Sequence, residues 1–289
     1  MINLMKILLY LFSTIITSQS ISAQINQRFH ENSRPLFEIG LGAINIDIPY
    51  YPGSKKNQNR TIPFIWPVYR GKYLRIDQEG TRAKLTDSRS IELSFSLGFS
   101  FPINSNDNPI REGLKDIDYI GEIGPRIIFR LISNSDIQKL NFNISLRSAY
   151  EVNSTNLKST QIGITGGPSI SYWVYLTKSK SASLFTSVSL LYGNNEYNTF
   201  FYGISGNNSF PSSSSYKANS GEISRRIFSR IAFNIGDTLQ LFFGGFYADL
   251  RHSKNIKSPL IEENNNSGIA LGFLWSFYQS DKKVNIYGN

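Results

Sequence analysis

One eleven-residue stretch, Ile91 to Phe101, constrains the fold of this chain most strongly. Every odd position in it holds a large apolar residue, and the even positions hold Glu92, serines and a glycine. A repeat of two residues predicts a β-strand with one apolar face and one small polar face. At about 3.3 Å per residue and a tilt near 45°, that strand rises roughly 25 Å, the height of the apolar band of a transmembrane barrel. Strands of soluble proteins are usually about 5–6 residues long, so the stretch predicts a lipid-facing strand.

The same alternation predicts further strands, and the links between them mostly alternate between short and long. Short periplasmic turns and longer outer loops are typical of transmembrane barrels. The fold class predicted for residues 36–278 is therefore all-β, an antiparallel transmembrane β-barrel of about 12 strands. We assign Tyr197 to Ile204 to an outer loop or to a hairpin arm above the membrane, because one more strand would place the chain ends on opposite sides. The further strands are expected at residues 37–46, 62–68, 73–77, 81–85, 119–131, 140–146, 161–176, 184–192, 223–235, 239–249 and 269–277.

The N-terminus predicts export. It carries one cation, Lys6, then an apolar run from Ile7 to Ile16 and small polar residues up to Ala23. This order is typical of a secretory signal peptide over residues 1–23, and the apolar run is too short for a membrane-spanning helix. A buried N-terminal strand is the alternative. Residues 24–35 would then form a polar periplasmic tail, and residues 279–289 a second tail at the C-terminus.

Composition limits the chemistry. The chain has no cysteine, 2 histidines and a formal net charge of +9. Disulfides and His/Cys zinc clusters are therefore excluded, and no cofactor is expected. A basic balance can indicate nucleic-acid binding, but export to the cell envelope argues against nucleic acid as a partner. We expect contacts with outer-membrane lipid and anionic lipopolysaccharide instead.

The polar faces of the predicted strands carry charges. A charge is costly against lipid but stable in a polar lumen, so these residues are expected to line the barrel interior. If the lumen is open, its arginines would favour anions. In the alternative of a soluble sandwich the apolar faces would point inward, and many strands would be twice the usual length. The predicted lumen residues are Glu92, Glu122, Arg126, Arg130, Arg147 and Arg230.

Candidate catalytic and metal-binding residues are few. Asp249, His252 and Ser253 lie close together in sequence, but we expect a solvated loop there and no enzyme activity. Three aspartates could bind a divalent cation through oxygen ligands, although turn capping is the expected role and no metal site is predicted. They are Asp107, Asp116 and Asp118.

Several segments resemble one family. The stretch from Gly40 to Ser54, the run from Ser105 to Asp118, and the Glu122-x-Gly-Pro125 that follows it resemble the MipA/OmpV family of outer-membrane proteins, the MltA-interacting protein type. The segments Tyr216 to Gly221 and Ser258 to Leu260 agree with the same pattern. The resemblance covers about Phe37 to Phe277. The most specific part is a loop with the motif residues Ser105, Asp107, Asn108, Arg111, Gly113, Asp116 and Asp118.

The resemblance implies an outer-membrane barrel without enzymatic activity. The best-known member of that family is described as a scaffold that brings a lytic transglycosylase together with a penicillin-binding murein synthase. Other members are associated with stress responses and adhesion. Three functions therefore stay open: a scaffold, a small porin or solute channel, and a surface adhesin acting through residues 102–116 and 194–221. A scaffold would have to use the two tails, because the predicted periplasmic turns are short.

Overall fold

The computed structural model describes residues 33–71, 74–77, 80–83, 90–132, 137–153, 155–205 and 215–285. The predicted signal peptide and residues 24–32 of the predicted tail lie outside these ranges. Within the described part, no helix is long and apolar enough to span a bilayer.

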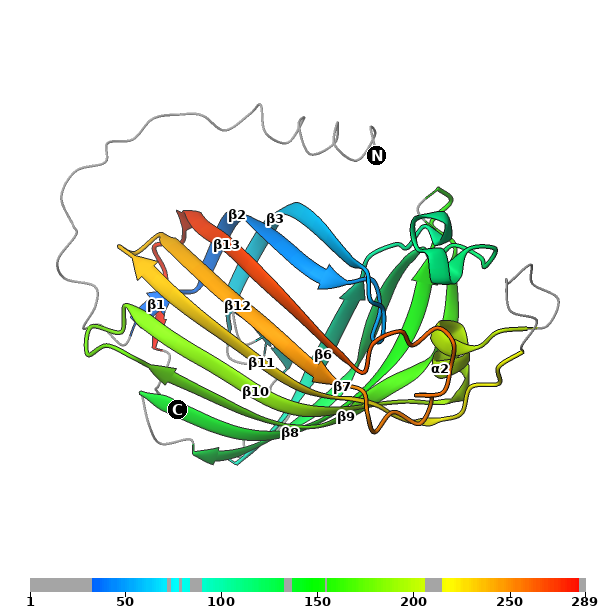
Figure 1. The fold of residues 1–289 in the computed structure, drawn as a ribbon. Helices are drawn as coiled ribbons and strands as arrows, with labels where there is room; N and C mark the ends of the chain where they lie inside the picture. The colour runs from blue at the N-terminus through cyan, green and yellow to red at the C-terminus, as the bar shows by residue number, and fades with distance from the viewer. Residues whose placement is uncertain are drawn as a thin grey trace.

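Twelve strands of the described chain form one closed antiparallel barrel (Figure 1). Each strand pairs with its neighbours in sequence, and β13 closes the barrel on β2. The predicted antiparallel barrel is therefore confirmed. Ten strands are long, whereas β4 and β5 have four residues each. The barrel strands are β2 (Phe37–Pro49), β3 (Asn57–Arg70), β4 (Leu74–Asp77), β5 (Gly80–Ala83), β6 (Ile91–Ser100), β7 (Tyr119–Ile132), β8 (Gln138–Val152), β9 (Ser159–Tyr175), β10 (Ala182–Gly193), β11 (Gly221–Ile235), β12 (Leu239–Asp249) and β13 (Asn265–Gln279).

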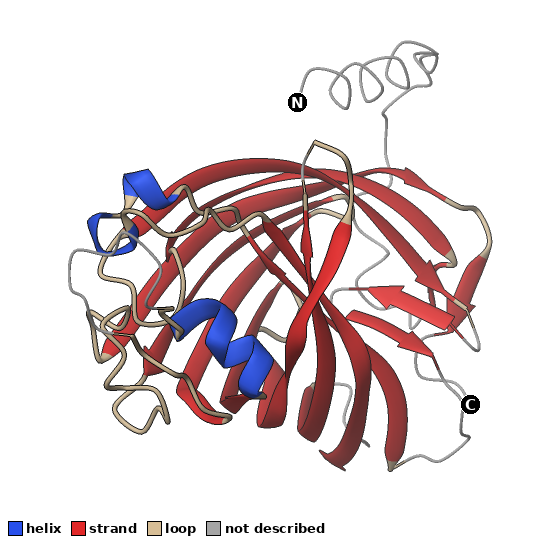
Figure 2. Ribbon diagram, turned by 90° about the vertical axis from the view of Figure 1, so that its right-hand side faces the viewer, coloured by secondary structure: helices blue, strands red, loops and turns tan. Residues whose placement is uncertain are grey.

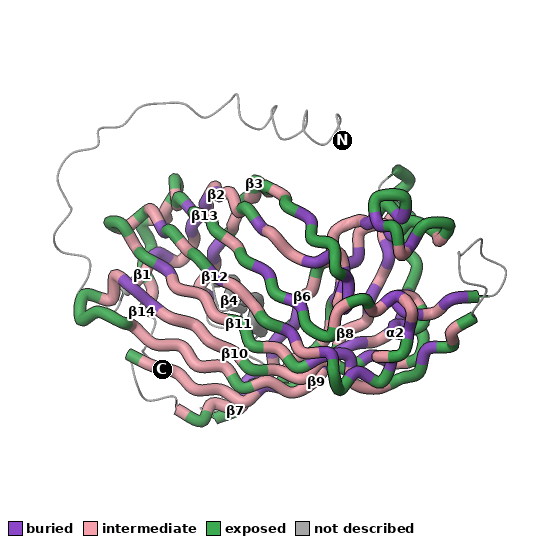
Figure 3. The backbone as a smooth tube through the Cα atoms, viewed as in Figure 1, coloured by how far each residue is buried: buried purple, intermediate pink, exposed green. Residues whose placement is uncertain are grey.

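The two faces of β6 behave as the sequence predicts. Leu97 is 62% exposed and Phe99 is 60% exposed, whereas Glu92 is 6% exposed and Ser94 2%. Figure 3 shows exposed and covered positions along the same strands. A barrel whose exposed face is apolar and whose polar side chains are covered has the orientation required in a bilayer.

Strand β3 reverses this pattern. Ile62, Phe64, Trp66 and Val68 face the lumen, whereas Pro63, Ile65 and Pro67 are exposed on the outer face. A Cβ on Gly42 would lie 2.5 Å from Cζ of Phe64, so the Phe64 ring lies flat over that glycine on the lumen wall. In the described part of the chain, β3 pairs with β4 only through Tyr69 and Arg70, so its two prolines interrupt no ladder on that side.

Two repeated Gly-Pro pairs interrupt the sheet in the same way. The β7–β8 ladder passes from Ile123 directly to Arg126, and the β9–β10 ladder passes from Gly166 to Ser169. Proline has no backbone N–H to donate, so each pair bends its strand where one ladder lapses. The pairs Gly124-Pro125 and Gly167-Pro168 therefore mark matching irregularities in the sheet.

Five elements of the described chain lie outside the barrel wall. The segment from Tyr197 to Ile204, expected as a loop or hairpin arm, is mostly the helix α2 (Asn195–Tyr202). Two short 3-10 helices, η2 (Ser105–Asp107) and η3 (Pro109–Arg111), lie in the loop before β7. At the opposite end, β1 (Ser33–Pro35) pairs with β14 (Lys283–Asn285). Figures 1 and 2 show α2 among the long loops, at the end of the barrel away from β1 and β14.

Candidate functional site

The loops at one end of the barrel pack into a single apolar cluster around α2, which we call the outer cap. Its members come from several loops and from the ends of β7, β8, β9 and β11, and Figure 2 shows α2 among the loops at that end of the barrel. The described chain begins in β1 and ends in β14 at the other end of the barrel. The connections at that end are mostly the shorter ones, which is typical of the periplasmic side of a transmembrane barrel. The cap is therefore on the outer side. Its buried members are Tyr51, Ile103, Ile117, Ile120, Ala149, Ile162, Tyr197, Phe201, Tyr202, Ala218 and Ile223.

Hydrogen bonds hold the loops of the outer cap to one another. The Tyr202 hydroxyl donates to the Pro52 carbonyl at 3.0 Å, and the Tyr51 hydroxyl donates to the Leu260 carbonyl at 2.9 Å. Ser258 Oγ donates to the carbonyl oxygen of Tyr202 at 2.7 Å. These bonds join three separate loops, so the cap is one packed unit.

Helix α2 begins with a side-chain N-cap that can be identified in the sequence. Asn194 Oδ1 accepts a hydrogen bond from the Tyr197 amide at 3.0 Å, and asparagine is among the best residues for this position. Glu196 in the first turn adds a favourable charge. This local signal could have identified the helix. The segment was expected to be a loop because one more strand would have made the number of strands odd.

The six predicted lumen residues lie on the inward faces of their strands. Arg147 Nε donates to Glu122 Oε2 at 2.8 Å, and Arg130 forms an ion pair with Glu92. Arg126 Nη2 donates to Ser94 Oγ at 3.2 Å. Arg230 lies on the inward face of β11, where it pairs with Phe185 of β10. The structure thus places these charges in the interior, and their action on a permeating solute stays a prediction.

Glu122 also joins the barrel wall to the outer cap, which the sequence did not indicate. Its Oε1 accepts a hydrogen bond from the hydroxyl of Tyr197 on α2 at 2.9 Å. The same carboxylate holds Arg147 through its other oxygen. Glu122 is only 9% exposed, so one buried carboxylate is bonded both to Arg147 of the barrel wall and to Tyr197 of the outer cap.

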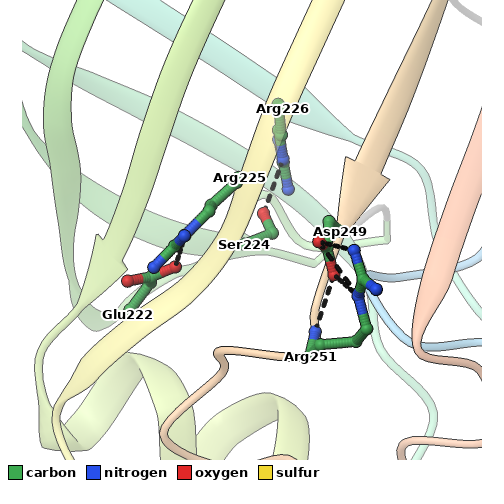
Figure 4. Close-up of polar contacts among 6 residues, drawn as sticks. All are labelled: Glu222, Ser224, Arg225, Arg226, Asp249 and Arg251. Atoms are coloured by element: carbon green, nitrogen blue, oxygen red, sulfur yellow. Dashed lines mark hydrogen bonds and ion pairs between the residues drawn. The ribbon is translucent and has the colours of Figure 1, made fainter.

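Strand β11 shows how adjacent cations take different partners (Figure 4). Arg225 Nε donates to Glu222 at 2.8 Å on the outer face, whereas Arg226 Nε donates to Ser224 Oγ at 2.9 Å on the inner face. Arg226 lies within electrostatic range of Tyr197 and Tyr202 of the outer cap. It therefore adds a cation to the lumen that the sequence analysis did not name.

The candidate catalytic group is not assembled. Asp249 makes an ion pair with Arg251 at 2.7 Å (Figure 4). Ser253 is 5% exposed and its Oγ accepts from the amide of Asn255, and His252 is exposed. In the described chain no hydrogen bond links Asp249, His252 and Ser253, although a nucleophile and its base require one.

The motif loop before β7 is a folded part of the outer cap. Asp116 Oδ1 accepts from the Ser105 amide at 2.7 Å, and Asp118 Oδ2 accepts from Asn153 at 2.9 Å. Gly113 has a φ of +82°, which favours glycine. The Asp107 carbonyl accepts from Lys56 of another loop. Asp116 and Asp118 thus make structural hydrogen bonds, and no group of three His, Cys, Asp or Glu in the described chain is placed to hold a metal ion.

The two remaining motif residues are buried. Asn108 is 1% exposed and Arg111 is 4% exposed, with the Arg111 guanidinium 5.5 Å from the ring centre of Tyr51. Burial raises the pKa of Tyr51 above its usual value, and the nearby Arg111 partly offsets that rise. Burial lowers the pKa of Arg111. The motif therefore supplies a cation–π contact inside the outer cap.

The periplasmic end carries the ribbon of β1 and β14. Arg34 pairs with Val284 in an antiparallel register. The Leu36 amide donates to the Lys282 carbonyl at 2.7 Å, and the Pro35 carbonyl accepts from Arg70 of β3 at 2.8 Å. The described parts of the two predicted tails therefore meet each other and are fixed to the barrel.

Comparison with known proteins gives a family. The chain matches the family described as MltA-interacting protein MipA over residues 39–277. No curated protein matches the sequence. An outer-membrane channel from Pseudomonas putida F1 is similar at 8% identity and a TM-score of 0.45, over 84% of this chain and 96% of that one. A bacterial polysaccharide outer-membrane secretin is similar at 8% identity and a TM-score of 0.42, over 85% of this chain and 99% of that one.

Identities this low do not transfer the function of the channel or of the secretin to this chain. The family match is different in kind, because it covers most of the sequence, and it agrees with the barrel and its apolar outer face. This protein is therefore an outer-membrane β-barrel that belongs to the MipA family.

Proposed function

We propose that this barrel is a non-enzymatic scaffold that brings a lytic transglycosylase together with a penicillin-binding murein synthase on the periplasmic side. The name of the family, MltA-interacting protein, supports an enzyme of murein turnover as the partner. The observation that carries the proposal in this chain is the ribbon of β1 and β14. It gives the periplasmic face an ordered segment beyond its turns.

The ribbon offers a specific mode of contact. It is a two-stranded sheet, and no third strand pairs with it in the described chain. A short two-stranded ribbon of this kind is a place where a partner could add a strand. Because the Pro35 carbonyl is bonded to Arg70, the ribbon is held to the barrel, and a partner that binds it would be held at the membrane.

The channel alternative is less favoured by the geometry. The outer cap places buried aromatic residues such as Phe201 and Tyr202, 4% and 1% exposed, at one mouth of the barrel. We expect this packing to hinder the passage of a solute. The adhesin alternative is also weakened, because the motif loop and α2 turn many of their side chains into the cap and away from the surface.

The test is affinity purification from gently cross-linked envelopes, with identification of the co-purified proteins. We expect a lytic transglycosylase or a murein synthase above the level of an unrelated barrel. Val284→Pro in β14 removes a backbone donor of the ribbon and should reduce that recovery. Lys257→Ala, at an exposed site of an outer loop, is the matched control and should not.

Two outcomes would contradict the scaffold. One is recovery of lipopolysaccharide and assembly factors alone. The other is equal enzyme recovery with Val284→Pro and the wild type, which would show that the ribbon of β1 and β14 does not bind the partner. Single-channel recording of the same preparations tests the porin alternative, for which a steady open conductance is expected.

A further inference from the structure

A groove runs along β7 on the outer face of the barrel. Its floor is Gly121, at which an added Cβ would meet nothing within 4 Å. In the sheet, Gly121 lies between Phe99 of β6 and Tyr150 of β8. These two aromatic residues form the walls, and Leu97 and Ile123 continue the groove toward the middle of the strands. The groove is shallow and open along its length.

The groove belongs to the lipid-facing surface. Phe99, Leu97 and Ile123 are 60%, 62% and 52% exposed, as expected for side chains that point away from the lumen. Glu122 also borders the groove, but its carboxylate is bonded to Arg147 and Tyr197 on the inner side. What fills an apolar groove at this height in a bilayer is a hydrocarbon chain, because water there would lack hydrogen-bond partners.

The position of the groove along β7 indicates which leaflet of the bilayer it faces. Tyr119, the first residue of β7, lies at the outer end, next to the outer cap, and the groove extends inward from there. Ser159 borders its outer end, and the preceding Lys158 is exposed. A cation at that height would lie beside the phosphates of an outer-leaflet lipid, at the level where apolar surface gives way to headgroups.

We propose that this groove is a binding site for one acyl chain of lipid A, with a lipid A phosphate beside Lys158. The glycine at position 121 creates the site, since any side chain there would fill the space between Phe99 and Tyr150. The site is independent of the scaffold proposal, because it lies on the opposite end of the barrel from β1 and β14.

The test measures binding of hexa-acylated lipid A to the purified full-length barrel by native mass spectrometry, with phosphatidylethanolamine as the competing lipid. The wild type should hold one lipid A more tightly than phosphatidylethanolamine. Gly121→Leu should weaken lipid A binding by about tenfold or more, because excluding two methylenes from burial has roughly that effect. Ala43→Leu, which adds bulk to the outer face of β2, is the matched control and should bind as the wild type does.

Two further variants separate the parts of the site. Lys158→Glu should weaken lipid A binding and leave phosphatidylethanolamine binding unchanged. Phe99→Ala removes one wall, and it replaces Gly121→Leu as the test if that variant does not show the heat-dependent electrophoretic shift of a folded barrel. The proposal is overturned if lipid A binds equally to the wild type and to the folded groove variants. It is also overturned if phosphatidylethanolamine binds the wild type as tightly as lipid A does.

Discussion

The buried carboxylate of Glu122 should be among the most sensitive side chains of this barrel. It accepts hydrogen bonds from Arg147 Nε at 2.8 Å and from the Tyr197 hydroxyl at 2.9 Å. Glu122→Gln keeps the shape and removes the charge, which leaves Arg147, with 15% of its side chain exposed, without its counter-ion. Breaking a buried ion pair costs about 3–5 kcal/mol, and a hydrogen bond to a charged group contributes about 1.5–3 kcal/mol.

We therefore expect Glu122→Gln to lower the free energy of unfolding by about 3 kcal/mol, and Tyr197→Phe by about 1.5 kcal/mol. Because the two residues share one bond, the double variant should lose less than the sum of the single losses. Unfolding by urea of the barrel in lipid vesicles, followed by tryptophan fluorescence, measures these values. Hydrogen exchange in α2 should increase in both single variants, since each releases the helix from the wall.

The chain contains a matched control for burial. Glu222 and Arg225 are joined by the same kind of bond at the same distance, 2.8 Å, but the Arg225 side chain is 48% exposed. Because water screens the exposed arginine of this pair, Glu222→Gln should change stability much less than Glu122→Gln does. If Glu122→Gln and Glu222→Gln have equal effects, or if α2 exchanges as slowly in Glu122→Gln as in the wild type, the carboxylate does not fix the outer cap to the wall and this reasoning is wrong.

Two other predictions test the sheet and the cap. Gly124→Ala should destabilise the barrel by about 1–3 kcal/mol, because the added Cβ would lie 2.0 Å from the Leu146 carbonyl oxygen. Gly121→Ala on the same strand places its Cβ in open space, so it should be tolerated in the same urea assay. The pKa of Tyr51 is raised in the folded protein, so folding favours the neutral form of this side chain. Its contribution to stability is fully present below about pH 10, which is the pKa of tyrosine in the unfolded chain. That contribution is lost as the pH rises toward the pKa of the folded state. Tyr51→Phe should therefore reduce the loss of stability on alkaline titration, and an unchanged alkaline transition would count against the assignment.

Much of this architecture could be predicted from local pattern. The two faces of β6 follow from its alternation, because side chains of a strand point to opposite sides in turn. The hairpin between β11 and β12 follows from Gly236, which has a φ of +61°. The paired irregularities at Pro125 and Pro168 follow from the missing N–H of proline. Each of these depends on residues adjacent in the chain.

Other features could not be predicted in this way. Alternation in β3 marks Ile62, Phe64, Trp66 and Val68 as one face, but does not say that the face is the inner one. In the folded chain the Phe64 ring lies against Gly42 of the neighbouring strand, a contact that the alternation does not reveal. The segment at α2 carries a local helix signal at Asn194, yet only the folded chain shows that the helix joins the outer cap.

The sequence by itself thus determined the barrel, its strands and the inward placement of its charges, because a period of two and turn chemistry are local properties of the backbone. Tertiary structure alone decided how the barrel is capped. The Tyr197 hydroxyl meets Glu122 across 75 positions of the chain, and the Tyr202 hydroxyl meets the Pro52 carbonyl across 150. Contacts between residues so far apart produce no periodic pattern in the sequence, because they form only once the chain has closed into a barrel. The groove over Gly121 has the same origin, because its walls come from two different neighbouring strands.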